Sequence, residues 1–396
     1  MSRSEESFRL IKHKLPRRWF LKTSGLAAVG AVAMRGDAWA RPSREMTLFI
    51  GTYTSTTSEG IYVYRMNSDT GQLTKFSSIR SENPSFLTLD RSKRFLYAVN
   101  EVPQFEGKAS GGVSAYAIDK TGKLNFLNQQ PSMGADPCYL TVDSKRTSLL
   151  VANYTGGNVA LLPILKNGTL GPATDVKQHE GSGPKEQQKG PHAHCIILDT
   201  HERYALAADL GSDKVMIYRF DSAAHQLQPG KQQLWSTLQA GAGPRHLTLH
   251  PNGRYAYVIN ELDSTLTTLN FNASAGTLTT TDTVSTLPSG FTGVSYCADV
   301  HVSANGKFLY GSNRGHNSIV VFAIDQRTGR PSLIEHVSTA GNWPRNFVID
   351  PTGRFLLFAN QRSDSVVVFR IDAQTGRLTP TGKSAQVPMP VCLKFN

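Results

Sequence analysis

The chain has 396 residues and a formal net charge of +12, from 42 Lys and Arg against 30 Asp and Glu. After residue 40 the basic residues form no dense block and no ladder with aromatic residues, which argues against a nucleic-acid-binding protein. The four cysteines lack C-x-x-C spacing, and no cluster of Asp, Asn and Glu stands out as a calcium loop, so we expect neither a bound metal nor a cofactor.

The first forty residues have the order of features found in an export signal. Residues 17–22 read R-R-W-F-L-K, a twin-arginine pattern, and an apolar run over residues 26–34 leads to A-W-A ending at Ala40. Nine apolar residues are too few to span a bilayer. We expect cleavage after Ala40, a mature chain without a membrane span, and a periplasmic or extracellular location. Loss of eight basic and three acidic residues lowers the net charge from +12 to +7.

Three short β-rich runs follow the signal, at residues 48–53, 61–66 and 73–79. A repeat then begins. The phrase PSFLTLD at 84–90 returns as PRHLTLH at 244–250 and PRNFVID at 344–350, and weaker copies start at 137, 191 and 297. A truncated copy at residues 390–396 ends the chain, and successive copies lie 46 to 54 residues apart. A period near 50 residues that is built from short strands predicts a β-propeller.

Each full unit contains four β-rich runs separated by turn residues. In the first unit they cover residues 86–89, 95–100, 112–118 and 124–128. The first turn reads P-N-G-R at 251–254 and P-T-G-R at 351–354, which is tight-turn chemistry between two strands. The repeat region has no convincing amphipathic helix, so a βαβ fold is excluded.

Six full units leave three N-terminal runs without an inner strand and one inner strand, residues 391–395, without followers. Together these make a seventh blade that closes the ring without an open edge. We therefore predict an all-β, seven-bladed propeller with four antiparallel strands per blade. Its single domain covers residues 41–396, after a signal peptide at 1–40.

Two positions in each unit are predicted to meet at one mouth of the central channel: the start of the inner strand, and the residue after the Asn or Asp that ends the second strand. The recurring Asn is expected to be structural and to bond its side chain to the backbone of the turn. The variable residues around it are the candidates for chemistry. They are Glu101, His192, His194, Arg245, His246, Glu261, Asp299, Arg314 and Arg345.

A mouth rich in Arg, His and Glu is typical of a site for a small anion, with titratable groups beside it. For any one of these residues, a salt bridge between blades is an equally good interpretation. Cys138, Cys195, Cys297 and Cys392 all fall near the start of an inner strand, where we expect small buried side chains. The sequence does not decide whether two of these cysteines form a disulfide between blades.

Several stretches carry a family resemblance. They read IGTYT at 50–54, VANY at 151–154, GPHAH at 190–194, GPRH at 243–246 with NE at 260–261, and SNRGH at 312–316. The set resembles the lactonase family of seven-bladed propellers over residues 47–396, a family that includes 6-phosphogluconolactonase and the fungal carboxy-cis,cis-muconate cyclase. Similarity to the cyclase implies an active site of His194 (or His192), Arg245, Glu261 and Arg314. Family members often have Glu where this chain has Asp299.

The resemblance implies hydrolysis of a sugar-type lactone. Glu261 or His194 would activate water, and Arg245 and Arg314 would hold the anionic group and the developing oxyanion. The remaining candidates, His192, His246, Asp299, Arg345 and Glu101, are expected to bind the substrate, which is a small anionic or sugar-derived molecule.

Two other interpretations stay open. The same four residues could form a lactone, as in a muconate-type cycloisomerase, or the mouth could bind a ligand without catalysis, because fold does not imply function. The phosphogluconolactone of the pentose phosphate pathway is cytoplasmic, so export leaves the natural substrate undecided.

Overall fold

The structure is a computed structural model that describes residues 45–55 and 57–396. The export signal predicted for residues 1–40 lies outside the described residues. The described part of the chain consists of β-strands and two 3-10 helices, η1 (Glu186–Gln188) and η2 (Gln361–Ser363). No helix among these residues has the length and apolar character needed to cross a membrane.

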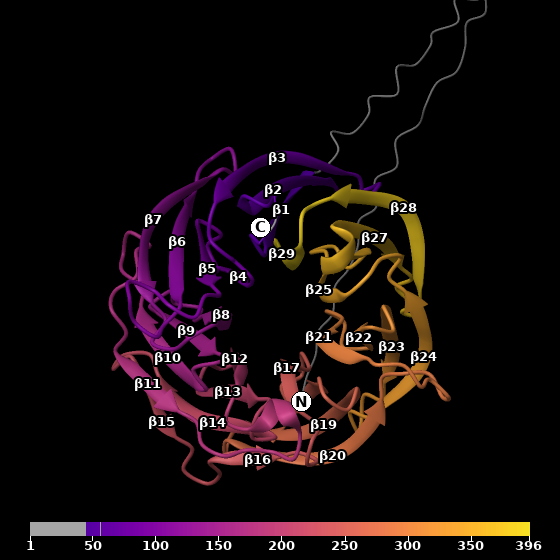
Figure 1. Cartoon of the computed structure of the whole chain (residues 1–396). Coiled ribbons are helices and arrows are strands. Elements are labelled where there is room, and N and C mark those ends of the chain that lie inside the picture. The colour runs from indigo at the N-terminus through magenta and orange to yellow at the C-terminus, as the bar shows by residue number, and fades with distance from the viewer. Residues whose placement is uncertain (1–44, 56) are drawn as a thin grey trace, which may run out of the picture. The chain divides into compact units, whose positions relative to one another are not determined.

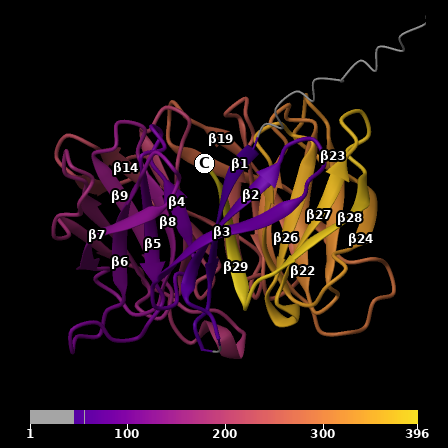
Figure 2. The ribbon, with the colours of Figure 1, turned by 90° about the horizontal axis from the view of Figure 1, so that it is seen from above.

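Seven antiparallel sheets are arranged as blades around a common axis (Figure 1). Within each blade the strands follow one another from the axis outward, and an edge-on view shows them running between the two faces of the ring (Figure 2). The prediction of an all-β, seven-bladed propeller is confirmed. We number the blades along the ring, starting with the blade that holds the N-terminal strands.

From the axis outward, blade 1 contains β29 (Pro390–Phe395), β1 (Glu45–Thr52), β2 (Gly60–Asn67) and β3 (Leu73–Arg80); blade 2 contains β4 (Leu87–Leu89), β5 (Phe95–Asn100), β6 (Gly112–Ile118) and β7 (Leu124–Pro131); blade 3 contains β8 (Pro137–Val142), β9 (Ser148–Asn153), β10 (Asn158–Pro163) and β11 (Asp175–Gln178). In the same order, blade 4 contains β12 (Ala193–Leu198), β13 (Tyr204–Asp209), β14 (Lys214–Asp221), β15 (Gln226–Pro229) and β16 (Trp235–Thr237). Blade 5 contains β17 (Pro244–Leu249), β18 (Tyr255–Asn260), β19 (Thr265–Asn272) and β20 (Thr277–Ser285); blade 6 contains β21 (Tyr296–Val302), β22 (Phe308–Arg314), β23 (Ser318–Ile324) and β24 (Pro331–Ser338); blade 7 contains β25 (Pro344–Ile349), β26 (Phe355–Asn360), β27 (Ser365–Ile371) and β28 (Leu378–Gln386).

Blade 1 closes the ring as predicted. The C-terminal strand β29 pairs antiparallel with β1, and Leu48 lies opposite Phe395 and Ile50 opposite Leu393. The backbone groups of both chain ends are therefore used within one sheet, and the inner edge of blade 1 is not left unpaired.

The core lies between neighbouring blades. Phe358 of blade 7, for example, is fully buried and belongs to one apolar cluster with Tyr310 and Val321 of blade 6. Tight turns keep the first two strands of a blade aligned. Gly253 and Gly353 adopt φ of +69° and +70°, a backbone conformation that glycine reaches without steric cost.

The Asn at the end of the second strand fixes the loop that leads to the inner strand, as predicted. Asn153 Nδ2 donates to the carbonyl of Ser132, and Asn313 Nδ2 donates to that of Thr286, each over 2.8 Å. The same contact is made by Asn100 to Glu82 and by Asn360 to Thr339. These bonds hold in place the segments that present the variable side chains.

Blade 4 differs from the repeat in two ways. Its outer edge is split into β15 and β16, which both pair with β14, so this sheet has five strands instead of four. Its inner strand also begins at Ala193, two residues after the predicted start at Pro191.

Candidate active site

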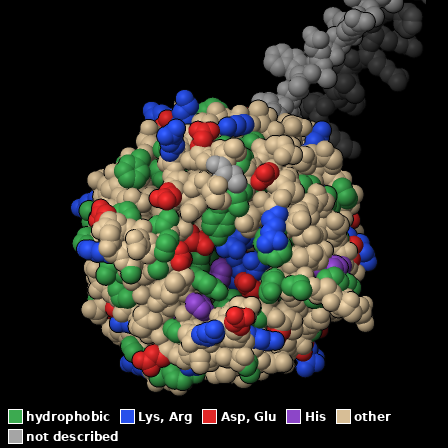
Figure 3. Space-filling view, in the orientation of Figure 1, with side chains coloured by type: hydrophobic (Ala, Val, Ile, Leu, Met, Phe, Trp, Pro, Cys, Tyr) green, Lys and Arg blue, Asp and Glu red, His purple; other side chains and the backbone are tan. Residues whose placement is uncertain are grey.

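The ring is hollowed at its centre on the face shown in Figure 3, and basic, acidic and histidine side chains gather in the hollow. Two positions of each blade supply them: the end of the second strand, at or just after its last residue, and the stretch that leads into the inner strand and includes its first two residues. We call the side chains at these positions the mouth. Its charged and aromatic members are Tyr53, Glu101, Tyr154, His192, His194, Arg245, Glu261, Arg314 and Arg345.

A repeated backbone bond positions the residue after the second strand. The N–H of Glu261 donates to the carbonyl of Gly243 over 2.7 Å, and that of Glu101 donates to Asn83 over 3.0 Å. The equivalent bond is made by Tyr53, Tyr154, Leu210 and Gln361. The side chains of these residues therefore leave the backbone at the same height in blades 1 to 5 and in blade 7, whereas in blade 6 Arg314 is the last residue of β22 and pairs with Tyr296.

A bulge positions the first residues of the inner strand. In blade 5 Pro244 pairs with Asn260 and His246 pairs with Ile259, so Arg245 has no partner on β18. A bulge re-aims side chains that would otherwise alternate between the two sides of a strand. Arg245 and His246 are accordingly both buried, with Nη1 of Arg245 3.2 Å from Nε2 of His246. The same register break isolates Cys138, His194, Arg345 and Val391.

The bulge separates the two histidines that the sequence left as alternatives. His194 occupies in blade 4 the bulged position that Arg245 occupies in blade 5. His192 instead lies in the preceding loop, where its Nδ1–H donates to the carbonyl of Tyr154 over 2.9 Å and its ring stacks on the Tyr154 ring at 4.5 Å.

Glu261 joins two buried arginines from different blades. Its Oε2 lies 2.8 Å from Nε of Arg245 and 2.8 Å from Nη2 of Arg314. Arg314 Nη2 also donates to the carbonyl of Cys297 over 2.9 Å, and Arg245 Nη1 donates to that of Ala298. These bonds fix the planes of both guanidinium groups.

The ion contacts leave hydrogen-bonding capacity free. The Nε–H of Arg314 is buried without a hydrogen-bond acceptor among the described residues, whereas the Nε–H of Arg245 faces Glu261 Oε2 at 2.8 Å without good hydrogen-bond alignment. Burial lowers the pKa of Arg245, and it lowers the pKa of Arg314 to about 10, so both stay cationic at neutral pH. Burial alone would raise the pKa of Glu261, but the charges of Arg314 and Arg245 outweigh it, and the net effect lowers that pKa.

A second carboxylate and arginine meet on the other side of the mouth. Tyr53 Oη donates to Oε1 of Glu101 over 2.9 Å and accepts a hydrogen bond from Nη2 of Arg345 over 2.7 Å. Nη2 of Arg345 lies 3.9 Å from Glu101 Oε1. Burial by itself would lower the pKa of Arg345, but Tyr53 and Glu101 reverse the shift, so this arginine is cationic too.

His194 is buried between aromatic rings. Its ring centroid lies 5.4 Å from that of Tyr154 and 5.3 Å from that of His246, and its Nδ1 lies 3.6 Å from Sγ of Cys138. Burial, followed by the charge of Arg245, lowers the pKa of His194 well below its usual value. His194 is therefore a neutral imidazole at neutral pH and carries no proton to give up as an imidazolium.

Asp299 and His246 lie one layer below the mouth, not in it. An arginine N–H only donates, so Nε2 of His246 accepts from Arg245, and the Nδ1–H donates to Asp299 Oδ1 over 2.8 Å. Oδ2 of Asp299 accepts from His301 Nε2 over 3.0 Å and from Asn346 Nδ2 over 2.5 Å. Both oxygens are thus occupied by protein donors. In this structure Asp299 supports His246, and through it Arg245.

Two features of the site were missed from the sequence. Tyr53 follows the second strand of blade 1 and so holds the same repeat position as Glu101 and Glu261; extending the repeat into the shared blade would have found it. The second is a buried pair between neighbouring blades, in which Nδ1 of His179, just after β11 of blade 3, lies 2.6 Å from Oδ2 of Asp209, at the end of β13 of blade 4. Nothing in the spacing of these two residues indicates that contact.

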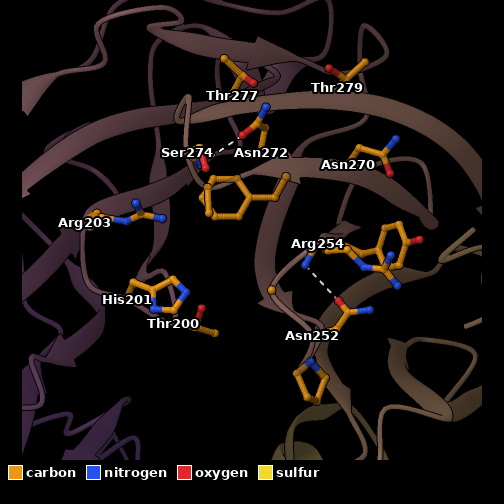
Figure 4. A pocket seen from close by; sticks show the side chains of 15 residues that line it. Thr200, His201, Arg203, Asn252, Arg254, Asn270, Asn272, Ser274, Thr277 and Thr279 are labelled. Carbon is orange, nitrogen blue, oxygen red and sulfur yellow. Dashed lines mark hydrogen bonds between the residues drawn. The ribbon is translucent and has the colours of Figure 1, made fainter. Parts of the chain in front are cut away.

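Other features offer weaker sites. A wide groove between blades 4 and 5 is lined by His201, Arg203 and Arg254, but the polar groups of its turns bond locally, as Arg254 N does to Asn252 Oδ1 over 2.9 Å (Figure 4). Within residues 45–55 and 57–396 no three His, Cys, Asp or Glu side chains are grouped to hold a metal ion.

Comparison with known proteins agrees with the propeller fold. The family described as "Lactonase, 7-bladed beta-propeller" matches residues 47–395. The chain is 38% identical to the 6-phosphogluconolactonase of Bacillus subtilis over 355 residues, which is 88% of this chain and 97% of that protein. It is 34% identical to the 6-phosphogluconolactonase of Formosa agariphila, over 77% of this chain and 86% of that protein.

A solved structure also resembles this chain over most of its length. The periplasmic gluconolactonase of Pseudomonas aeruginosa superposes with a TM-score of 0.84 at 34% identity, covering 89% of this chain and 99% of that one. The strand order, the closure of blade 1 and these matches lead to one conclusion: the chain belongs to the lactonase family of seven-bladed β-propellers.

Proposed function

We propose that the protein hydrolyses a sugar-type lactone at the mouth. Relatives that align over most of the chain are named for lactone hydrolysis. The observation that carries the proposal is the arrangement of Arg245 and Arg314: two buried guanidinium groups from different blades, each 2.8 Å from the same carboxylate oxygen of Glu261.

This arrangement suits the charge changes of lactone hydrolysis. Attack of water on the ring carbonyl places a negative charge on the carbonyl oxygen, and opening of the ring produces a carboxylate. Buried, preoriented donors stabilise such a charge without reorganising during the reaction. Arg245 and Arg314 would bind the carbonyl oxygen and then the product carboxylate, and Glu261 would keep the two cations together in the free enzyme.

The neutral His194 completes the catalytic set. An uncharged imidazole beside Arg245 can hydrogen-bond the ring oxygen of the lactone or the attacking water. His192 and Tyr154 form a half-buried wall on this side of the mouth, and we assign to them contacts with the sugar hydroxyls. Arg345 and Glu101 lie across from this wall.

We also propose that the protein acts after export. The support is the twin-arginine pattern at residues 17–22 and the A-W-A pattern ending at Ala40. Replacing Arg17 and Arg18 by Lys should keep the protein in the cytoplasm in a cell-fractionation experiment, and normal export of that variant would refute the proposal.

The activity is tested by titrating acid release from a panel of aldonolactones in a pH-stat, with spontaneous hydrolysis subtracted. We expect turnover by the wild type and a loss of kcat/KM of at least about 100-fold in Arg245→Ala and in Arg314→Ala. Arg203→Ala, in the groove between blades 4 and 5, is the matched control and should behave as wild type. A folded wild type that opens no lactone would favour a binding protein instead.

A further inference from the structure

A water-sized cavity adjoins Glu101 at the mouth, and Glu261 is not among the residues that line it. It has a volume of about 10 Å³, enough for one water molecule. Its polar lining comes from Ser85, Glu101, Arg245, His246 and Arg345. The cavity therefore touches both carboxylate and guanidinium groups.

Two polar atoms from this lining are buried without a protein partner. Oε2 of Glu101 and Oγ of Ser85 make no hydrogen bond with any described residue, and Ser85 as a whole is only 5% exposed. A buried polar atom without a partner costs about 1–3 kcal/mol. A carboxylate oxygen only accepts, whereas a hydroxyl both donates and accepts. A water molecule between them would satisfy both.

The carboxylate of Glu101 is held with one oxygen free. Tyr53 Oη donates to Oε1 over 2.9 Å, and Arg345 Nη2 fixes Tyr53 from behind over 2.7 Å. All the protein hydrogen bonding to this carboxylate within the described residues thus falls on Oε1. Oε2 remains as a preoriented acceptor.

We propose that Glu101 is the general base of the hydrolysis and that the water it activates is bound between Glu101 Oε2 and Ser85 Oγ. The inference rests on the proposed lactonase function. The water oxygen bonds to the lactone carbonyl carbon while one water proton passes to Oε2. The carbonyl oxygen takes the negative charge beside Arg245. Collapse breaks the bond between that carbon and the ring oxygen, the ring oxygen takes the proton from Glu101, and the acid formed ionises to solvent.

Glu261 is a poorer candidate for this step. Its Oε2 lies within 2.8 Å of two guanidinium groups, and their charges lower its pKa, which weakens it as a base. The two carboxylates therefore have separate roles. Glu261 orients Arg245 and Arg314, and Glu101 moves the proton. Tyr53 is a positioning residue, because it acts through Glu101.

The experiment compares Glu101→Gln with wild type on the aldonolactone that the wild type opens fastest. General-base catalysis contributes about 10²–10⁴-fold, so kcat should fall by at least about 100-fold while KM stays within about threefold. In Glu101→Ala, added formate should restore kcat at least about tenfold, whereas Arg245→Ala should gain nothing from formate. Glu335→Gln, on the outer strand β24, is the control carboxylate and should keep full activity.

If Glu101→Gln keeps kcat within about threefold of an active wild type, Glu101 is not the base although the lactonase stands. No turnover by the folded wild type would reject the lactonase and the base together. Folding of Glu101→Gln is checked by far-ultraviolet circular dichroism. If this variant does not fold, Ser85→Ala and Tyr53→Phe are measured in its place. Both should lower kcat about tenfold at unchanged KM, and unchanged kcat in both would overturn the proposal.

Discussion

Arg245 and His246 are neighbours in the chain, yet both side chains are buried on the same side of β17, with Nη1 of Arg245 3.2 Å from Nε2 of His246. The bulge at Arg245 makes this arrangement possible, because a regular strand would send the two side chains to opposite sides. It connects the mouth to the layer beneath it: Glu261 holds Arg245 from above, and Asp299 holds His246 from below.

Glu261→Gln should lower the stability of the protein as well as its catalytic activity. The substitution removes the charge that compensates Arg245 and Arg314 in a site where both are buried. Removing one partner of a buried ion pair lowers the free energy of unfolding by about 3–5 kcal/mol. We expect a lower Tm in scanning calorimetry, and we expect Arg245→Met combined with Glu261→Gln to recover part of the loss. A Tm equal to that of the wild type would show that the three charges are not coupled.

Asp299→Asn should reduce kcat without contacting the substrate. The carboxylate accepts from His246, His301 and Asn346, and an amide cannot accept on both sides. We expect kcat to fall about tenfold, with a smaller effect on KM, because Arg245 loses its support. A large rise in KM at unchanged kcat would instead mean that Asp299 binds the substrate directly, as the sequence pattern predicted.

Stability should fall in mild acid because His246 is buried uncharged. Burial lowers its pKa from 6.5 to about 4, so between these values the unfolded chain binds a proton that the folded chain does not. The stability that this residue contributes is complete above pH 6.5 and is lost as the pH falls toward 4, by about 3 kcal/mol. The charged and titratable groups that face it are Arg245, Asp299, His194 and Tyr139.

The pH effect is measured by the free energy of unfolding in urea at pH 7.5 and pH 4.5, for wild type and His246→Gln. The free energy of unfolding of the wild type should fall by most of the about 3 kcal/mol given above, and that of the variant should fall by less. Equal losses in both proteins would show that the His246 environment does not contribute to acid sensitivity.

All four cysteines should be unreactive in the folded protein. Cys138, Cys195, Cys297 and Cys392 are free and buried, and burial raises the pKa of Cys392 to about 11 and those of Cys195 and Cys297 to about 12. Titration with a thiol reagent should find almost no reactive thiol in native protein and four after denaturation without reductant. Finding only two in the denatured protein would reveal a disulfide between blades.

Much of the fold follows from the repeat, because a blade needs the same turn chemistry and the same apolar alternation each time. The turns at Gly253 and Gly353 and the closing strand β29 all fall where the period places them. Blade 4 departs from the period, because its inner strand begins at Ala193 and its outer edge is broken before Trp235. Such local insertions change the spacing of strands without leaving a turn signal.

The repeat predicts which side chains meet at the mouth but not how deep each one lies. Repeat positions alone bring Arg245, Glu261 and Arg314 together, and the structure joins them within hydrogen-bonding distance. The bulges are what the sequence does not show. They shift Asp299 one layer down and make His194, not His192, the equivalent of Arg245. No residue type marks a bulge in these strands, since the bulged residues range from Cys138 to Arg345.

The most direct measurement is a crystal structure of the protein with a bound aldonate, the product of the proposed reaction. The carboxylate should lie within hydrogen-bonding distance of Arg245 and Arg314 and next to Glu101, with the sugar hydroxyls directed toward His192 and Tyr154. An aldonate bound elsewhere, such as the groove beside Arg203 and Arg254, with the mouth free of ligand at saturating concentration, would contradict the account.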